Sequence, residues 1–472
     1  MSQTEVPKKH HITESDPYKL DASDVQKAPT RFRERFKYLG PGIITSAMIV
    51  GSGELIVTTS LGAQAGFALL WMVIIASTVK VWVQLELAQW TIITGKPALE
   101  GYASIGPKVK GLGIINYAWI IMELCKALQR GGIIGGTAGA LSILAPVIGE
   151  PLSGPSLAFW AIVTTLTVIA MMITAKYSVV ERICVVAIVV LTAITVGLAA
   201  VLPMTDYAYS AADIASGLTF AIPAGALGFA VAMFGITGVG AEEMTAYTYW
   251  CIEKGYARWT GPNDGTKEWQ QRAKGWINIM SLDVLVGWMI STICTMSFFT
   301  LGASILHPQG LVPSGNEMLL TLSNIYTSIL GDWASTLFLV GAIFVLFSTV
   351  IGVAASVPRQ WANTFGLMGL FDWKDMAKRK KWIRVLTVVI PSLWCISFLI
   401  VNEPVIMVLI GGTAAGIFLL AVVVAVWVLR TRDEPKVFRK NTVLNVILAV
   451  CSLLVAALAI YSVVKTFGIE IG

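Results

Sequence analysis

Charged side chains are scarce in this sequence. Asp, Glu, Lys and Arg make up 13% of the 472 residues, whereas hydrophobic residues make up 56%. An average soluble domain has about twice that share of charge, so this composition does not supply the polar surface of a fold in water. The class that remains is a protein built into a lipid bilayer.

Several chemical motifs are also absent. The six cysteines are scattered and none belongs to a Cys-x-x-Cys pair, which excludes a disulfide framework and a thiolate metal site. No His-Glu-x-x-His sequence occurs, and no paired catalytic motif indicates an enzyme. The net charge of +6 does not indicate nucleic-acid binding, because the basic residues lie in short loops between apolar runs.

Lysine and arginine are missing from every second loop. The apolar runs predict about eleven spans of roughly 20 residues each, at residues 43–61, 68–91, 114–143, 157–174, 183–202, 222–249, 276–305, 337–357, 385–401, 406–429 and 443–464. The loops without Lys or Arg are 62–66, 146–156, 203–221, 306–336 and 402–405. Because basic loops stay in the cytoplasm, we expect an all-α, multi-pass protein of the cell membrane, with the N-terminus inside and the C-terminus outside.

Two of the spans carry glycine and glutamate where a helix in contact with lipid should carry neither. Span 1 reads Gly51-Ser-Gly53-Glu54, and span 6 reads Gly238-Val-Gly240-Ala-Glu242-Glu243. Glycine weakens a helix by about 1 kcal/mol at each position, and a carboxylate in mid-membrane costs several kcal/mol unless it is paired, protonated or bound to a cation. We therefore predict breaks near residues 51–53 and 238–241. The alternative is that the glycines pack helices and the glutamates lie at interfacial depth.

The two predicted breaks are five spans apart. This spacing is expected of two inverted five-helix repeats, in which the broken first helices build the substrate site at the midplane. Residues 39–202 and 203–430 are the predicted repeats, residues 431–472 an added C-terminal helix, and residues 1–38 a flexible cytoplasmic tail without the apolar core of a signal peptide. We expect a monomer, with Glu54 and Glu242 close enough to reach one cation and free carbonyls at the breaks as further ligands.

Several stretches outside the breaks match one known family. They are Leu39-Gly-Pro-Gly-Ile43, Gly62-Ala-Gln-Ala-Gly-Phe-Ala-Leu-Leu-Trp71, Gln84 with Thr94-Gly95, Trp119-Ile-Ile-Met-Glu123 and Gly136-Thr-Ala138. In these residues the chain resembles the NRAMP family of divalent-metal transporters, strongly through span 3 and more weakly through span 10. The resemblance implies a LeuT-like fold, and alternating-access transport of Mn, Fe or Mg type cations, with the metal as substrate and no cofactor.

The chain departs from the family motifs where the metal binds. The family's Asp-Pro-Gly-Asn in span 1 is replaced by Gly51-Ser-Gly53-Glu54. Its Met-Pro-His in span 6 falls on Glu242-Glu243-Met244 when the match is anchored on Tyr247, and three residues earlier when it is anchored on Thr237. Neither register places a thioether or an imidazole at the family's position. The chain is thus predicted to be a divergent branch with a harder, carboxylate-rich site.

The predicted site residues follow from this comparison. We expect the metal site to comprise Gly51, Glu54, Glu242 and Glu243, and coupling or gating to involve Glu123, Arg130 and Met244. Arg130 stands where the family has an aspartate used for proton movement. It lies two helical turns from Glu123, and we expect it to pair with Glu123 or with a glutamate of the empty metal site. Because an arginine does not relay protons, we expect weak or absent proton coupling. The alternative is that desolvated glutamates exchange protons for metal.

Other charged residues also lie within predicted spans: Lys80, Glu86, Lys126 and Asp283. For Lys80 and Glu86 we expect internal ion pairs or snorkelling toward the interface. A rival function is transport of an amino acid or another small solute on the same fold, in which the amides of Gly51-Ser-Gly53 would bind a carboxylate. Glu54 would repel that carboxylate, which favours a cation.

Overall fold

The computed structural model describes residues 16–51, 53–174, 189–190, 192–223 and 225–466, and this part of the chain is built from helices. Eight of its stretches are long and apolar enough to cross a membrane, and the first of them, Pro41–Thr94, contains two predicted spans. The first part of the fifth predicted span lies outside the described residues, and the apolar helix Thr192–Met204 covers most of the rest. The membrane class is confirmed, whereas the eleven-span count and the two repeats stay predictions.

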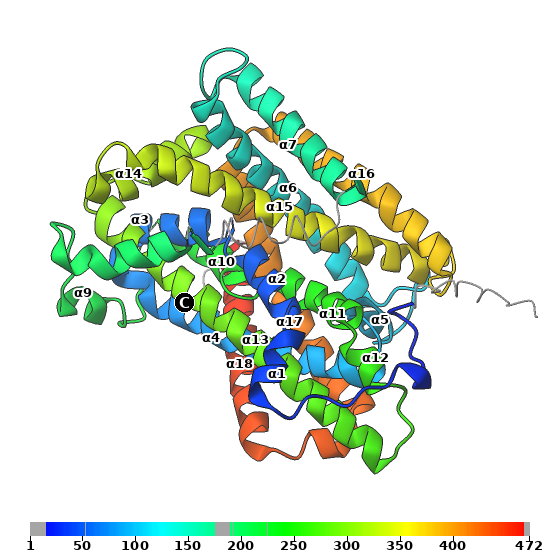
Figure 1. Cartoon of the computed structure of the whole chain (residues 1–472). Helices are drawn as coiled ribbons and strands as arrows, with labels where there is room; N and C mark the ends of the chain where they lie inside the picture. Colours follow the sequence, from blue (N-terminus) through cyan, green and yellow to red (C-terminus); the bar gives the residue numbers. More distant parts are fainter. Residues whose placement is uncertain (1–15, 52, 175–188, 191, 224, 467–472) are drawn as a thin grey trace, which may run out of the picture.

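Long helices form one bundle (Figure 1). They are α4 (Leu70–Thr94), α6 (Ile114–Leu144), α7 (Gly154–Thr174), α13 (Lys267–Leu301), α15 (Ala334–Leu367), α16 (Met376–Val401), α17 (Pro404–Asp433) and α18 (Thr442–Thr466). Helix α6 packs against α7, α15, α16 and α17, while α13 packs against α4 and α18 packs against α4 and α17. The site residues on α6 are thereby enclosed by protein on several sides.

Short helical segments connect the long ones. They are η1 (Ala22–Asp24), α1 (Phe32–Arg35), η2 (Phe36–Tyr38), η4 (Gly66–Leu69), α5 (Ala98–Ala103), η5 (Leu202–Met204), α9 (Ala211–Ser216), α12 (Tyr256–Thr260), η6 (Gly302–Leu306), η7 (Gly315–Glu317), α14 (Met318–Leu330) and η8 (Lys436–Phe438). Helix α14 occupies a stretch expected to be a loop. Its buried face, which includes Leu319 and Leu322, packs against α15, so tertiary burial stabilises a helix too short to span the membrane.

Spans 1 and 6 are both interrupted, as predicted. Span 1 consists of α2 (Pro41–Ile49), a π-helical segment η3 (Gly53–Thr58) and α3 (Thr59–Ala65). Span 6 consists of α10 (Leu227–Ile236) and α11 (Ala241–Lys254), so its break runs over Thr237–Gly240 and ends just before Ala241. Helix α10 packs against η3 and α11 packs against α2, which places the two breaks face to face near the centre of the bundle (Figure 1).

Glycine is required at these breaks for two different reasons. Gly238 has φ +64°, in the left-handed region that side chains rarely adopt. Gly51 has instead no room for a side chain, because a Cβ there would lie 1.6 Å from Thr349 Oγ1. The break in span 6 is therefore fixed by backbone conformation, and the break in span 1 by its close approach to α15.

Asp283 of α13, a buried acid without an assigned role in the sequence, caps the start of span 1. Its carboxylate accepts hydrogen bonds from the backbone N–H of Gly40 (2.8 Å) and of Gly42 (2.5 Å) and from the Tyr247 hydroxyl (2.9 Å). Backbone N–H groups in the first turn of a helix have no partner within the helix, so this carboxylate satisfies donors that would otherwise be buried unpaired.

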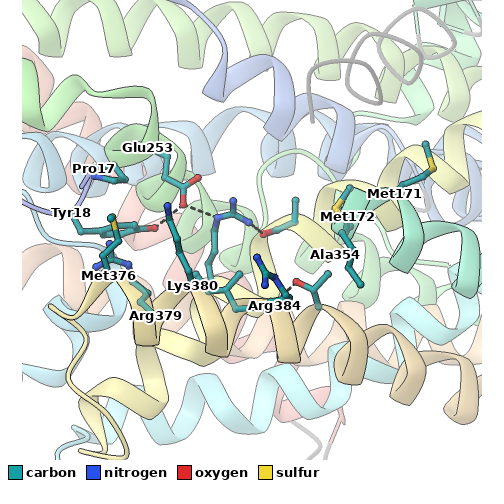
Figure 2. A pocket seen from close by; sticks show the side chains of 15 residues that line it. Pro17, Tyr18, Met171, Met172, Glu253, Ala354, Met376, Arg379, Lys380 and Arg384 are labelled. Carbon is teal, nitrogen blue, oxygen red and sulfur yellow. Dashed lines mark hydrogen bonds and ion pairs between the residues drawn. The ribbon is translucent and has the colours of Figure 1, made fainter. Parts of the chain in front are cut away.

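The polar N-terminal segment, expected to be mobile, is packed against the bundle from Asp16 onward. Tyr18 donates a hydrogen bond to Glu253 (3.0 Å), and Asp16 pairs with Arg379 at 2.5 Å. Burial, followed by the negative charge of Glu253, raises the pKa of Tyr18 well above its usual value, so its hydroxyl remains a donor. Figure 2 shows Tyr18, Glu253 and Arg379 at a cavity of about 430 Å³, which Arg359 also lines. The positive-inside pattern predicts that this cavity opens to the cytoplasm.

Gly238 and Gly53, one glycine from each break, make a matched pair for mutation. Gly238→Ala places a side chain in the left-handed region, which costs about 1–2 kcal/mol, and we expect a clearly lower unfolding temperature. Gly53→Ala should have little effect, because a Cβ at Gly53 would lie 3.4 Å from its nearest neighbour, Ile236 O. Thermal unfolding of both variants in detergent measures the difference. Equal unfolding temperatures would show that the left-handed conformation of Gly238 is unnecessary.

Candidate functional site

Glu242 is held by two cations from α6. Its Oε2 lies 3.0 Å from Lys126 Nζ, and its Oε1 lies 2.6 Å from Arg130 Nη2. All three side chains are at most 2% exposed. Glu242 also lies in the first turn of α11, where the positive end of the helix dipole stabilises a carboxylate. One strongly stabilised carboxylate thus offsets part of the cost of burying two cationic side chains.

Arg130 pairs with Glu123, one of the two kinds of partner expected for it. The guanidinium donates from Nη1 to Glu123 Oε2 (2.9 Å) and from Nη2 to Glu123 Oε1 (3.1 Å). Its planar fork matches both carboxylate oxygens, and its carbon Cζ lies 5.1 Å from the centre of the Trp394 ring. Arg130 therefore bridges Glu123 and Glu242, and ties α6 to the start of α11.

Glu243 is less completely neutralised than its neighbour. Its Oε1 lies 3.9 Å from Lys126 Nζ, and its Oε2 has no hydrogen-bond partner in the described part of the chain. The side chain is buried, and Oε2 would lie 2.4 Å from a Cβ at Gly240. This oxygen thus folds back over the break in span 6, where a Cβ at position 240 would also lie 2.7 Å from the backbone carbonyl oxygen of Gly235.

Glu54 occupies a separate polar cage between the two breaks. Its carboxylate accepts hydrogen bonds from Thr58 Oγ1 (2.8 Å) and from the backbone N–H of Gly238 (3.3 Å). Thr58 Oγ1 lies in turn 2.8 Å from Thr237 Oγ1. Glu54 is completely buried, so these contacts connect span 1 directly to the break in span 6.

A cavity of about 10 Å³, the room needed by roughly one water molecule, lies beside the glutamates of span 6. Gly53, Lys126, Arg130, Glu242 and Glu243 are among the residues that line it. Glu54 does not line it, and in the described residues no three His, Cys, Asp or Glu side chains form a group that could hold a metal ion. The expectation that Glu54 and Glu242 reach one cation remains a prediction.

The other predicted site residues are placed as follows. The carbonyl of Gly51 accepts a hydrogen bond from Leu55 N–H (3.1 Å), so it is only partly free for a ligand. Met244 is buried in the apolar core next to the glutamates of α11. A thioether does line the cavity, but it belongs to Met48 of span 1, a residue without a predicted role.

Two lysines were not assigned to the site by the sequence. Lys126 is three residues from Glu123 and four from Arg130. This spacing puts the three charged residues on one face of span 3, and it is the sequence signal that could have assigned Lys126 to the site. Lys80 was expected to form an ion pair or to snorkel, and this was wrong: it is fully buried and donates to the carbonyls of Phe234 (2.7 Å) and Thr237 (2.5 Å). Glu86, in contrast, forms the expected ion pair, with Arg430.

Two interrupted helices that meet at buried charges in the centre of a helical bundle are typical of transporters with the LeuT-like architecture. A family model described as natural resistance-associated macrophage protein-like, Nramp, matches residues 42–465. The chain belongs to the Nramp family, which confirms the resemblance seen in the sequence.

Individual relatives are distant. An uncharacterized protein of Pasteurella multocida is 25% identical over 348 residues, covering 72% of this chain and 73% of that protein. Metal transporter Nramp3 of Oryza sativa is 23% identical over 411 residues, covering 84% of this chain and 66% of the rice protein. The crystal structure of a mutant of the Eremococcus coleocola manganese transporter superposes with a TM-score of 0.64 at 14% identity, covering 96% of this chain and 93% of that one. The last comparison shows a shared fold.

The buried pair of Arg130 and Glu123 provides a test of the ion network. Removing one partner of such a pair costs about 3–5 kcal/mol, whereas replacing both by apolar residues is often nearly neutral. We expect Arg130→Met to lower the unfolding temperature strongly, and the double variant Arg130→Met with Glu123→Met to recover much of the loss. Thermal unfolding of both single variants and the double variant measures the coupling. Additive losses would mean that the two side chains do not stabilise the fold as a pair.

Proposed function

We propose that this Nramp family transporter moves divalent cations of the Mn, Fe or Mg type by alternating access, through the cavity beside Glu242 and Glu243. The observation that supports this most directly is the carboxylate of Glu243. One of its oxygens is buried and lacks a hydrogen-bond partner among the described residues. Such an oxygen in low dielectric is stabilised strongly by an incoming cation.

The position of Lys126 supports the same proposal. Its ammonium lies between the two glutamates, at 3.0 Å from Glu242 Oε2 and 3.9 Å from Glu243 Oε1. A metal ion that bridged both carboxylates would occupy this same region. We therefore infer that Lys126 neutralises the glutamates when no metal is present, and that a divalent ion displaces its ammonium on binding. Carboxylate ligands favour Mg²⁺ and Mn²⁺, while the thioether of Met48 at the cavity edge suits a softer ion.

A small organic solute is the second candidate, because Lys126 and Arg130 would suit its carboxylate. The size of the cavity opposes this reading. About 10 Å³ accommodates a water molecule or an ion but not an amino acid. Glu242 also pairs already with both Lys126 and Arg130, so the carboxylate of a solute would have to enter beside the carboxylate of Glu242.

Uptake into proteoliposomes tests the substrate and the role of Glu243 together. We expect saturable uptake of at least one of Mg²⁺, Mn²⁺ and Fe²⁺, and none of amino acids. Glu243→Gln keeps the shape and removes the charge, and should reduce the uptake at low metal concentration about tenfold or more, equivalent to about 1.4 kcal/mol of lost binding. Glu317→Gln, at an exposed position in η7, is the control and should transport normally.

The same assay separates the two glutamate clusters. If Glu54 binds the ion directly in another conformation, Glu54→Gln should lose transport as steeply as Glu243→Gln. Unchanged affinity and rate for Glu54→Gln would assign it a structural role in the cage with Thr58 and Gly238. Amino-acid uptake without metal uptake would overturn the proposed function.

Proton coupling is expected to be weak or absent. A proton that travelled past Glu242 would approach Lys126 and Arg130, and like charges repel strongly in low dielectric. Liposomes loaded with a pH-sensitive dye, given external metal at zero applied gradient, should therefore show no acidification. Metal-driven acidification that disappears in Glu54→Gln or Glu242→Gln would show that the glutamates carry protons, contrary to this expectation.

A further inference from the structure

Lys80 holds an ammonium group against the end of a broken helix. The side chain belongs to α4 and is 0% exposed. Its Nζ lies 2.7 Å from the carbonyl oxygen of Phe234 and 2.5 Å from that of Thr237. These carbonyls belong to the last turn of α10 and to the first residue of the break, where the helix has no N–H groups of its own to offer them.

The ammonium is stabilised by dipoles rather than by an ion pair. In the described part of the chain no carboxylate lies within ion-pairing distance of Lys80, although Glu54 and Glu243 act on it from farther away. The negative end of the α10 dipole faces it, and its nitrogen lies 5.3 Å from the centre of the Phe234 ring. A buried charge without such compensation would cost several kcal/mol.

The surrounding backbone forms a built site for this group. Ser77, one helical turn before Lys80, lies directly against the break, since a Cβ at Gly238 would be 3.2 Å from Ser77 Cα. The carbonyl of Ser77 accepts a hydrogen bond from Trp288 Nε1 (2.8 Å), which braces α4 from the side of α13. Helix α4 thus delivers the ammonium to the carbonyls at a fixed place.

In transporters with broken helices, carbonyls at the C-terminal end of a half-helix coordinate a small monovalent cation. We propose that the carbonyls of Phe234 and Thr237 form a monovalent-cation site, and that the ammonium group of Lys80 occupies it as a tethered cation. The ammonium has the charge of Na⁺ or K⁺ and replaces it, so the protein does not depend on either ion at this break. This inference does not depend on which substrate is transported.

The test removes the tether and asks whether a free cation takes its place. Lys80→Ala leaves the carbonyls and opens space, whereas Lys80→Met removes the charge but keeps the space filled. Both variants should unfold at a lower temperature than the wild type in choline chloride. At matched ionic strength and without divalent metal, NaCl, KCl or ammonium chloride should raise the unfolding temperature of Lys80→Ala by several degrees in a saturable manner. The same salts should leave the wild type and Lys80→Met unchanged.

Each other outcome overturns the proposal. If no small monovalent cation stabilises Lys80→Ala beyond choline, the carbonyls do not form a cation site. If Lys80→Met or the wild type responds equally, the cation binds elsewhere. Should Lys80→Ala be too unstable to purify in choline, its recovery in sodium, potassium or ammonium salts becomes the measurement, and failure in all of them counts against the site. Because no transport is measured, failure here leaves the proposed metal transport untouched.

Discussion

Glu242 is the residue on which the buried charges of this transporter depend. Lys126 and Arg130 are buried on α6, and both contact this carboxylate. An unpaired charge buried away from water costs several kcal/mol, so α6 tolerates them because α11 begins beside them and presents an acid there. The interruption of span 6 thus supplies both the helix terminus that stabilises Glu242 and the position from which it reaches α6.

Charged side chains of both signs are buried around the two breaks. Counted as fully ionised, the four buried carboxylates exceed the three buried cationic side chains by one charge: Glu54, Glu123, Glu242 and Glu243 against Lys80, Lys126 and Arg130. Bare carboxylates at this depth would repel one another and trap a divalent ion. Partial neutralisation by the cationic side chains lowers both effects.

The sequence predicted those features that depend only on the residue types and spacings within a single helix. Glycines and glutamates in apolar runs indicated the two breaks, and a spacing of seven residues indicated that Arg130 faces Glu123. It did not predict that Lys126 contacts Glu242, because that contact depends on how α6 packs against α11. The carbonyl partners of Lys80 were hidden for a different reason: every residue has a carbonyl, and only the path of the backbone shows which ones lack a partner.

The cap formed by Asp283 has a mechanical consequence. Through hydrogen bonds to Gly40, Gly42 and Tyr247, one carboxylate on α13 joins the start of α2 to the side of α11. The half-helices α2 of span 1 and α11 of span 6 are therefore linked to each other through one residue of α13. A displacement of either half-helix strains the hydrogen bonds to the other, so Asp283 couples the positions of the two half-helices mechanically.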